Sequence, residues 1–272
     1  MDSASFLEFY EHTLLAFKDL APHQKKHLQD IQRFDEVHLS APAGAGKTFV
    51  AVQRVIDALT EETEKAPAHV LYVAPTVELT YYFIQWMIVR LASQAESRLV
   101  SEINELLQRM VVLHSPYQAL LSPRLDEKDR RITLEVAGSI DTFGLTVMDE
   151  SHNLYAEGVD QGILADLKSR RRLLLSDESQ AATVSTRFPE MHRANLREVV
   201  RSTRQIVLGA RSFRSDTGAV TSTGTDGPPL KSYLFDASDA KGEFELYAQH
   251  VADAMGTLQM HIPTSVSTND SR

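Results

Sequence analysis

The strongest chemical signal in the sequence is the segment APAGAGKT at residues 41–48. Its glycines let a backbone turn approach a ligand without a Cβ in the way, and the amides of such a turn at a helix N-terminus hold phosphate groups. Lys47 would reach the β- and γ-phosphates and the Thr48 hydroxyl would bind Mg²⁺, although the strict pattern has glycine where this chain has Ala41. We therefore expect a site for a nucleoside triphosphate with magnesium, and specifically for ATP. The residues expected to contact the nucleotide here are Pro42, Ala43, Gly44, Ala45, Gly46, Lys47 and Thr48.

A second candidate is the segment LTVMDESHNL at residues 145–154, an apolar strand that ends in two adjacent acids. We expect Asp149 to hold Mg²⁺ through its water shell and Glu150 to orient and deprotonate the attacking water. Open α/β sheets bind ligands at the carboxyl ends of their strands, so these acids would lie beside the phosphate-binding loop. A solvated acidic turn is the alternative interpretation.

Two weaker candidates follow along the chain. In LLLSDESQ, residues 173–180, Asp177 and Gln180 either reach toward the γ-phosphate or cap a turn. In LREVVRSTRQIV, residues 196–207, Arg201 would supply positive charge to the transferring phosphoryl group. Such an arginine contributes roughly 10³ to 10⁵ in rate when it is correctly placed, whereas a lone arginine on a helix usually faces solvent.

Regular elements are predicted around these residues. A short strand at 36–40 runs into the phosphate-binding loop, and a helix at 48–59 follows it. Helical periodicity returns from Val77 to about Arg109, with a break near Ser93. Strands that alternate with helices indicate a parallel sheet with crossover helices. The further strand-like apolar runs are 70–74, 110–114, 146–148 and 173–176.

The order of these motifs resembles that of a known family. It matches the first RecA-like half of a superfamily 1 helicase over about residues 20–210, closest in style to the compact Schlafen-like branch. The resemblance implies an α/β fold of the RecA-like P-loop NTPase type, a mostly parallel sheet with helices on both faces. The segments that carry it are LAPHQ with Gln24, APAGAGKT, VAPT ending at Thr76, DESH at 149–152, SDESQ at 176–180 and VVRST at 199–203.

The resemblance also implies roles for single residues. Gln24 would read the adenine edge, because a carboxamide can donate and accept hydrogen bonds as a pair. Thr76 would lie on the nucleic-acid path, Gln180 would sense the γ-phosphate, and Arg201 would be the arginine contact within the chain. His152 fills the last position of a DExH pattern, or else is a packed structural residue.

The sequence divides into four expected parts. Residues 1–35 form a helical segment with the adenine-reading glutamine, and 36–211 form the RecA-like domain. Residues 212–232, rich in Gly, Thr, Ser and Pro, form a linker. Residues 233–272 resemble only the opening of a second RecA-like domain, and no motif in them supplies the second arginine of such a site. The chain is then a truncated product, a degenerate relative or half of a complex, and we do not expect it to unwind nucleic acid alone.

The composition limits which classes of protein the chain can belong to. The chain has 272 residues, of which 43% are hydrophobic and 24% charged, enough for a folded core. It has no cysteine, which excludes disulfides and thiolate sites. A net charge of −9 argues against a broadly basic surface but permits a local basic groove. Since there is no signal peptide and no uncharged apolar run of membrane-spanning length, we expect a soluble intracellular protein, cytoplasmic or nuclear.

The leading hypothesis is an ATP-hydrolysing, helicase-type core that acts on single-stranded DNA or RNA. Its catalytic residues would be Lys47, Glu150, Gln180 and Arg201, with a second subunit or domain completing the site. The rival is a nucleotide-gated binding or regulatory module with little or no turnover. A small-molecule kinase fits less well, because the acidic pair suits water better than a substrate hydroxyl and nothing resembles a lid.

Overall fold

The computed structural model describes residues 22–61, 69–94, 100–126, 128–129, 131–177, 186–199, 202, 204–211, 221–222, 226 and 243–261. The chain separates into two compact units, Met1–Gly227 and Pro228–Arg272. The described part of the second unit is helix α9, Glu243–His261. All other elements below belong to the first unit.

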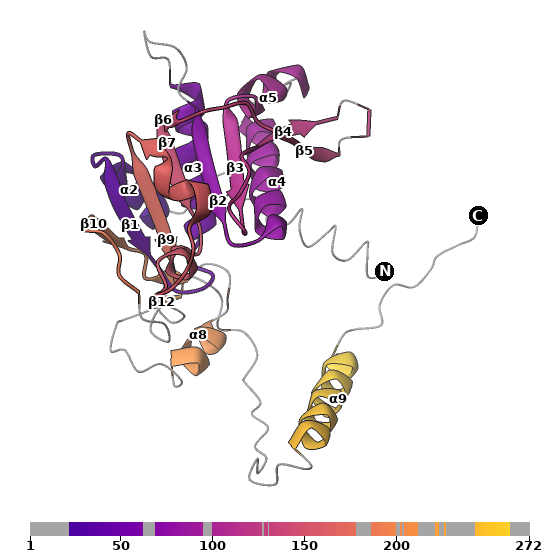
Figure 1. Ribbon diagram of the computed structural model, residues 1–272. Coiled ribbons are helices and arrows are strands. Elements are labelled where there is room, and N and C mark those ends of the chain that lie inside the picture. The colour runs from indigo at the N-terminus through magenta and orange to yellow at the C-terminus, as the bar shows by residue number, and fades with distance from the viewer. Residues whose placement is uncertain are drawn as a thin grey trace. The chain divides into compact units, whose positions relative to one another are not determined.

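The first unit is built on one large sheet (Figure 1). Within the described residues this sheet has eight strands in the order β10-β1-β9-β7-β2-β3-β4-β5. Neighbours from β10 to β3 run parallel, and β4 and β5 form an antiparallel hairpin at the edge beyond β3. The strands are β1 Glu36–Ser40, β2 Val70–Ala74, β3 Met110–His114, β4 Leu121–Leu125, β5 Ile132–Val136, β7 Leu145–Met148, β9 Arg172–Ser176 and β10 His192–Asn195.

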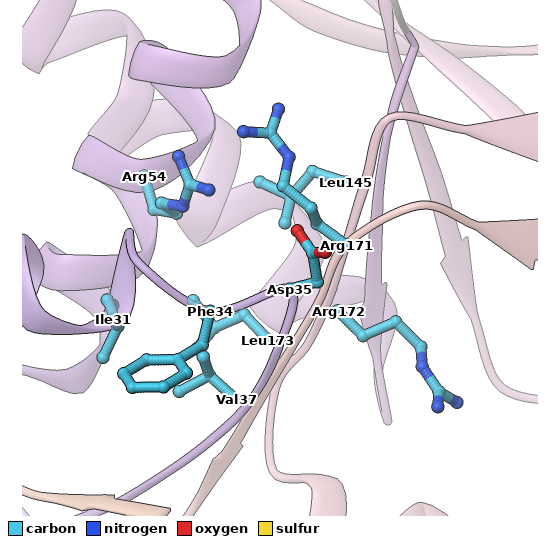
Figure 2. Close-up of a pocket in the computed structure, with 9 residues that line it drawn as sticks. All are labelled: Ile31, Phe34, Asp35, Val37, Arg54, Leu145, Arg171, Arg172 and Leu173. Atoms are coloured by element: carbon cyan, nitrogen blue, oxygen red, sulfur yellow. The ribbon is translucent and has the colours of Figure 1, made fainter. Parts of the chain in front are cut away.

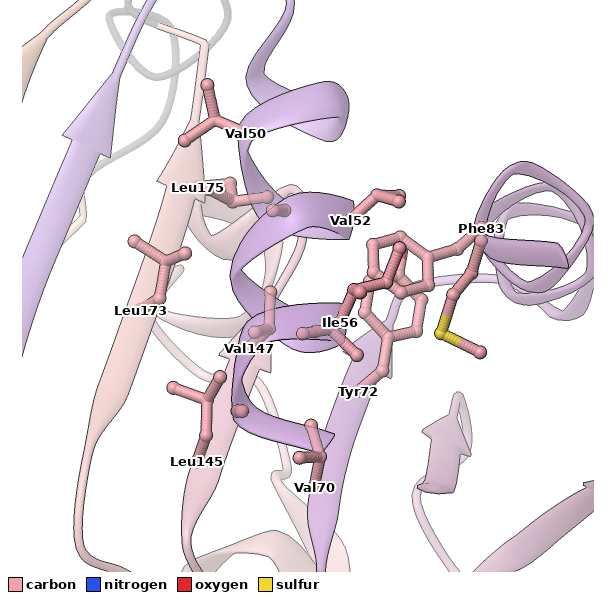
Figure 3. Packing of buried hydrophobic residues seen from close by; sticks show 14 of the residues in the cluster. Val50, Val52, Ile56, Val70, Tyr72, Phe83, Leu145, Val147, Leu173 and Leu175 are labelled. Atoms are coloured by element: carbon pink, nitrogen blue, oxygen red, sulfur yellow. The ribbon is translucent and has the colours of Figure 1, made fainter. Parts of the chain in front are cut away.

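Helices cover both faces of the sheet, and they are longer on one of them. Alternate residues of the strands point to opposite faces, because side chains in a strand have a period of two. Leu145 and Val147 pack on the side of helix α3 (Figure 3). Met148 packs in a second cluster on the other side of the sheet. The α3 side carries α2 Pro22–Ile31, α3 Lys47–Thr60, α4 Val77–Gln94 and α5 Val100–Leu107. The other side carries the short helices α6 Ser151–Leu154 and η1 Gly162–Asp166.

Small elements complete the first unit. Two short strands, β6 Thr142–Phe143 and β8 Lys168–Ser169, pair in parallel. Two more, β11 Glu198–Val199 and β12 Thr221–Ser222, also pair in parallel, and helix α8 spans Arg204–Arg211. Strand β12 falls within the predicted linker 212–232, so these two residues are part of a sheet; apart from Asp226, the rest of that range lies outside the described residues.

The predicted fold class is confirmed: the protein is α/β, with a mostly parallel sheet and helices on both faces. The five predicted strands of the sheet are present, and the long helical pattern is broken, since α4 ends at Gln94 and α5 begins at Val100. The sequence prediction missed the β4–β5 hairpin and β10. Residues 1–21 of the predicted helical segment 1–35, and all of the predicted fragment 233–272 except residues 243–261, lie outside the described residues. No described helix is long and apolar enough to cross a membrane.

A buried polar contact joins the two strands that lead into the site. His38 in β1 and Ser176 at the end of β9 face away from α3, and His38 Nε2 lies 2.7 Å from Ser176 Oγ. Phe188 packs on the His38 ring, with the ring centroids 4.2 Å apart. Burial, and secondarily Arg193, lowers the pKa of His38 from 6.5 to about 4.

This pKa shift predicts a pH dependence of stability. Between pH 6.5 and about 4, His38 is protonated in the unfolded chain but remains neutral in the folded chain. The free energy of unfolding therefore falls as the pH falls through this window. From pH 7 to pH 5 we expect the wild type to lose about 1–2 kcal/mol more than His38→Gln, measured by urea unfolding at both pH values. Equal losses in the two proteins would contradict the assignment.

Candidate nucleotide site

The phosphate-binding loop joins the end of β1 to the start of α3. Gly44 and Gly46 have φ angles of 78° and 90°, in the left-handed region that glycine adopts at least cost. Gly46 is the N-cap of α3, and no described side chain caps that end of the helix. The first amides of the 14-residue α3 are thus left for an external acceptor, and an oxyanion is the acceptor that a helix N-terminus favours.

Lys47 is buried at the base of this loop. Its Nζ donates a hydrogen bond to Ala41 O at 3.0 Å and lies 3.8 Å from Asp177 Oδ2. Asp177 directly follows β9 and is itself buried. The ammonium group is therefore held by oxygens of the chain at the place where phosphate oxygens would take over these contacts.

Gln24 packs directly on the loop from α2. Its Nε2 donates to Ala45 O at 3.2 Å, and the side chain is buried. A Cβ on Gly46 would meet the Gln24 carboxamide, so a side chain there would displace Gln24 as well as strain the left-handed backbone. The carboxamide expected to read adenine thus lies against the loop. Whether it contacts the base remains a prediction.

The two acids follow β7. Asp149 is buried, and each of its carboxylate oxygens accepts one hydrogen bond at 2.9 Å: Oδ1 from the Glu150 amide and Oδ2 from the Tyr72 hydroxyl. Burial raises the pKa of Asp149, while these two donors and the charge of Lys47 oppose the rise. Tyr72 was not predicted as a site residue. In the sequence it is one tyrosine within the apolar strand VLYVA, and a tyrosine that only packs in the core would give the same pattern.

Glu150 has an unusual backbone. Its φ of 45° is left-handed, which costs a residue with a Cβ about 1–2 kcal/mol. Its Oε2 is buried, makes no hydrogen bond within the described part of the chain, and lies 3.4 Å from Nδ1 of the buried His152. Burial, followed by the charge of Asp149, raises the pKa of Glu150. A carboxylate with a raised pKa is suited to accept a proton from water.

The strand order of the sheet brings these groups together at the carboxyl ends of the strands. Strand β9 lies between β1 and β7, and the three run parallel, so their carboxyl ends are adjacent. The phosphate-binding loop, Asp177 and the Asp149–Glu150 pair therefore share one side of the molecule. The small cavity in Figure 2 lies at the opposite, amino ends of the same strands, which are marked by Asp35, Leu145 and Arg172.

The residues fit a nucleotide with magnesium. Thr48, the second residue of α3, and Asp149 are the groups that would hold the metal, and the loop amides with Lys47 would hold the phosphates. The described residues contain no group of three or more acids, histidines or cysteines that could hold a metal ion by themselves. Magnesium that arrives with phosphates needs only one or two protein groups, because water and phosphate oxygens complete its shell.

Of the other predicted residues, one follows β2 and two lie outside the described part of the chain. Thr76 is exposed just before α4, and its Oγ accepts the Leu79 amide at 3.3 Å, so it caps that helix. Gln180 and Arg201 lie outside the described residues.

Comparison with known proteins identifies the family. Residues 21–194 match the DEAD/DEAH box helicase family. The chain belongs to this family. The match covers the loop, both acids and Asp177, so this DEAD/DEAH box domain has a nucleotide-binding, helicase-type core. No curated protein sequence matches the chain.

Two solved structures show distant likeness to the helicase domain. The ATPase domain of the Thermus phage P74-26 large terminase has 12% identity and a TM-score of 0.33, over 74% of this chain and 88% of that one. The Pyrococcus furiosus Hef helicase domain has 13% identity and a TM-score of 0.36, over 86% of this chain and 53% of that one. Likeness at this distance carries no argument about the site.

The geometry of the phosphate-binding loop predicts how an added methyl group at Gly46 changes the stability of the protein. Gly46→Ala places a Cβ in the left-handed region and displaces Gln24 from Ala45. Gly158→Ala is the matched control, because Gly158 has a φ of 82° and nothing in the described structure lies within 4 Å of its Cβ position. Urea unfolding should show a loss of about 1 kcal/mol for Gly158→Ala and about 1 kcal/mol more for Gly46→Ala. Equal losses would show that Gln24 does not restrict the loop.

Proposed function

We propose that this helicase domain binds ATP with Mg²⁺ at the 42–48 loop, hydrolyses it, and uses the cycle to act on single-stranded nucleic acid. The observation that carries the proposal is the position of Lys47 close to the Asp149 and Glu150 carboxylates, at the carboxyl ends of the parallel strands β1, β9 and β7. Membership of the DEAD/DEAH box family supports both the proposed binding of a nucleotide and the proposed action on nucleic acid.

In this proposal catalysis depends on position and charge. The amides at the start of α3 bind the phosphates, and Lys47 exchanges Ala41 O and Asp177 for phosphate oxygens. Magnesium, when bound, neutralises charge that develops on the phosphates. Glu150 orients a water and takes its proton, which its raised pKa favours.

Further groups complete the proposed site. Gln180 would sense the γ-phosphate and Arg201 would contact the transferring group, as the motif order of the resemblance implies. A second RecA-like domain or a second subunit would supply another arginine, and residues 233–272 would be the opening of such a domain. The Schlafen-like branch of superfamily 1 is the finer assignment that the same motifs support. Thr76 would face the nucleic acid from the start of α4.

Two variants separate binding from turnover. Lys47→Ala removes the ammonium group that contacts the phosphates, so equilibrium titration should show at least a hundredfold loss of ATP affinity, or about 3 kcal/mol. Glu150→Gln keeps binding within a few-fold but lowers the hydrolysis rate by about 10² or more, because an amide cannot take the proton. Lys168→Ala, at an exposed position, is the control and should change neither quantity. Tight ATP binding by Lys47→Ala would refute the loop assignment.

Polynucleotide stimulation tests the nucleic-acid part. ATP hydrolysis is measured with and without single-stranded DNA and RNA, and we expect one of the two to raise the rate at least tenfold. The stimulation should fall as salt rises, because phosphate contacts release counterions. Tight ATP binding with negligible hydrolysis in every condition would instead favour the nucleotide-gated module.

A further inference from the structure

Tyr72 has a place in the structure that core packing alone does not explain. It is fully buried in the middle of β2, and its ring stacks on Phe83 of α4 with centroids 3.8 Å apart and planes 17° from parallel (Figure 3). A phenylalanine would satisfy that stack. The hydroxyl at the tip of the ring nevertheless makes a 2.9 Å hydrogen bond, and its acceptor is the Asp149 carboxylate.

The strand register explains how the hydroxyl reaches this acid. Tyr72 pairs with Val147 of β7, so its ring reaches along the sheet toward the residue two positions later, Asp149. Leu145 and Val147 face α3, and the strand alternation puts residue 149 on the same face. The first turn of α3 carries Thr48. The bond therefore holds the carboxylate on the side of the sheet where Thr48 lies.

The carboxylate has little rotational freedom. The Tyr72 hydroxyl engages Oδ2 and the Glu150 amide engages Oδ1, so one donor is fixed on each oxygen. One donor comes from a stacked, buried ring and the other from the backbone. The Tyr72 hydroxyl is the donor of its bond, because an ionised carboxylate has only acceptor atoms. Each carboxylate oxygen keeps a further lone pair for a metal-bound water.

We propose that Tyr72 is a positioning residue for magnesium: its hydroxyl orients the Asp149 carboxylate toward the ion that accompanies the nucleotide. This inference rests on the proposed function. Hydrogen-bond partners of metal-binding groups act in this way, and their loss usually lowers metal affinity by 10- to 100-fold. The structure offers this role to a side chain outside the phosphate-binding loop and outside the acidic segment.

The test compares nucleotide affinity with Mg²⁺ and with excess EDTA. Tyr72→Phe keeps the ring and its stack but removes the donor. We expect its affinity for ATP with Mg²⁺ to fall about tenfold, while its affinity in EDTA stays within twofold of the wild type. In an Asp149→Asn background, the same change should alter the Mg²⁺-dependent affinity by less than twofold, because the oriented carboxylate is already absent.

Each result decides the matter. An equal loss with and without Mg²⁺, or no loss in either condition, overturns the role of Tyr72 while the proposed function stands. A wild-type protein that binds no ATP overturns the proposed function and this inference with it. If Tyr72→Phe does not fold, replacement of Tyr72 by p-aminophenylalanine restores a donor at the ring tip. That protein should keep the Mg²⁺-dependent affinity within threefold of the wild type, and a selective loss of it would overturn the proposal.

Discussion

Parallel pairing of β1, β9, β7 and β2 is the constraint on which the rest of the structure depends. Four strands that run the same way end at the same edge, and each one here ends in groups that can do chemistry. The registers fix these ends to within a residue, as the pairs Ser40 with Ser176 and Met148 with Leu174 illustrate. The site therefore follows from backbone hydrogen bonds between strands before any of its side chains contact one another.

Hydrophobic burial on both faces keeps this arrangement in place. Each central strand contributes alternate residues to two separate clusters, so a shift of one residue in any pairing would exchange the two faces. At the amino ends of the strands, ion pairs join Arg172 to Glu36 and Arg171 to Glu61. These ion pairs thus lie at the amino ends of the strands. Glu150, with its left-handed backbone and its carboxylate oxygen without a hydrogen bond in the described structure, lies at the carboxyl ends.

Much of this could be predicted from the sequence, since the informative patterns are local. The strand before the loop, the helix after it and the acids after an apolar run each depend on a few consecutive residues, and all of them are found where expected. Contacts between distant segments could not be predicted. Gln24 against Gly46 and Tyr72 against Asp149 join residues 22 and 77 positions apart, and only the folded sheet brings them together. The β4–β5 hairpin escaped because Pro123 and Arg124 interrupt its apolar pattern.

The hairpin also offers a practical site for engineering. Its connecting turn begins at Asp126, whose carboxylate accepts the amides of Lys128 and Asp129, and it joins the two strands at the sheet edge beyond β3. Four strands lie between β5 and β9, so a change in this turn leaves the phosphate-binding side untouched. A fluorophore, an affinity tag or an inserted reporter peptide belongs there, since exposed loop tips with polar residues tolerate insertion best.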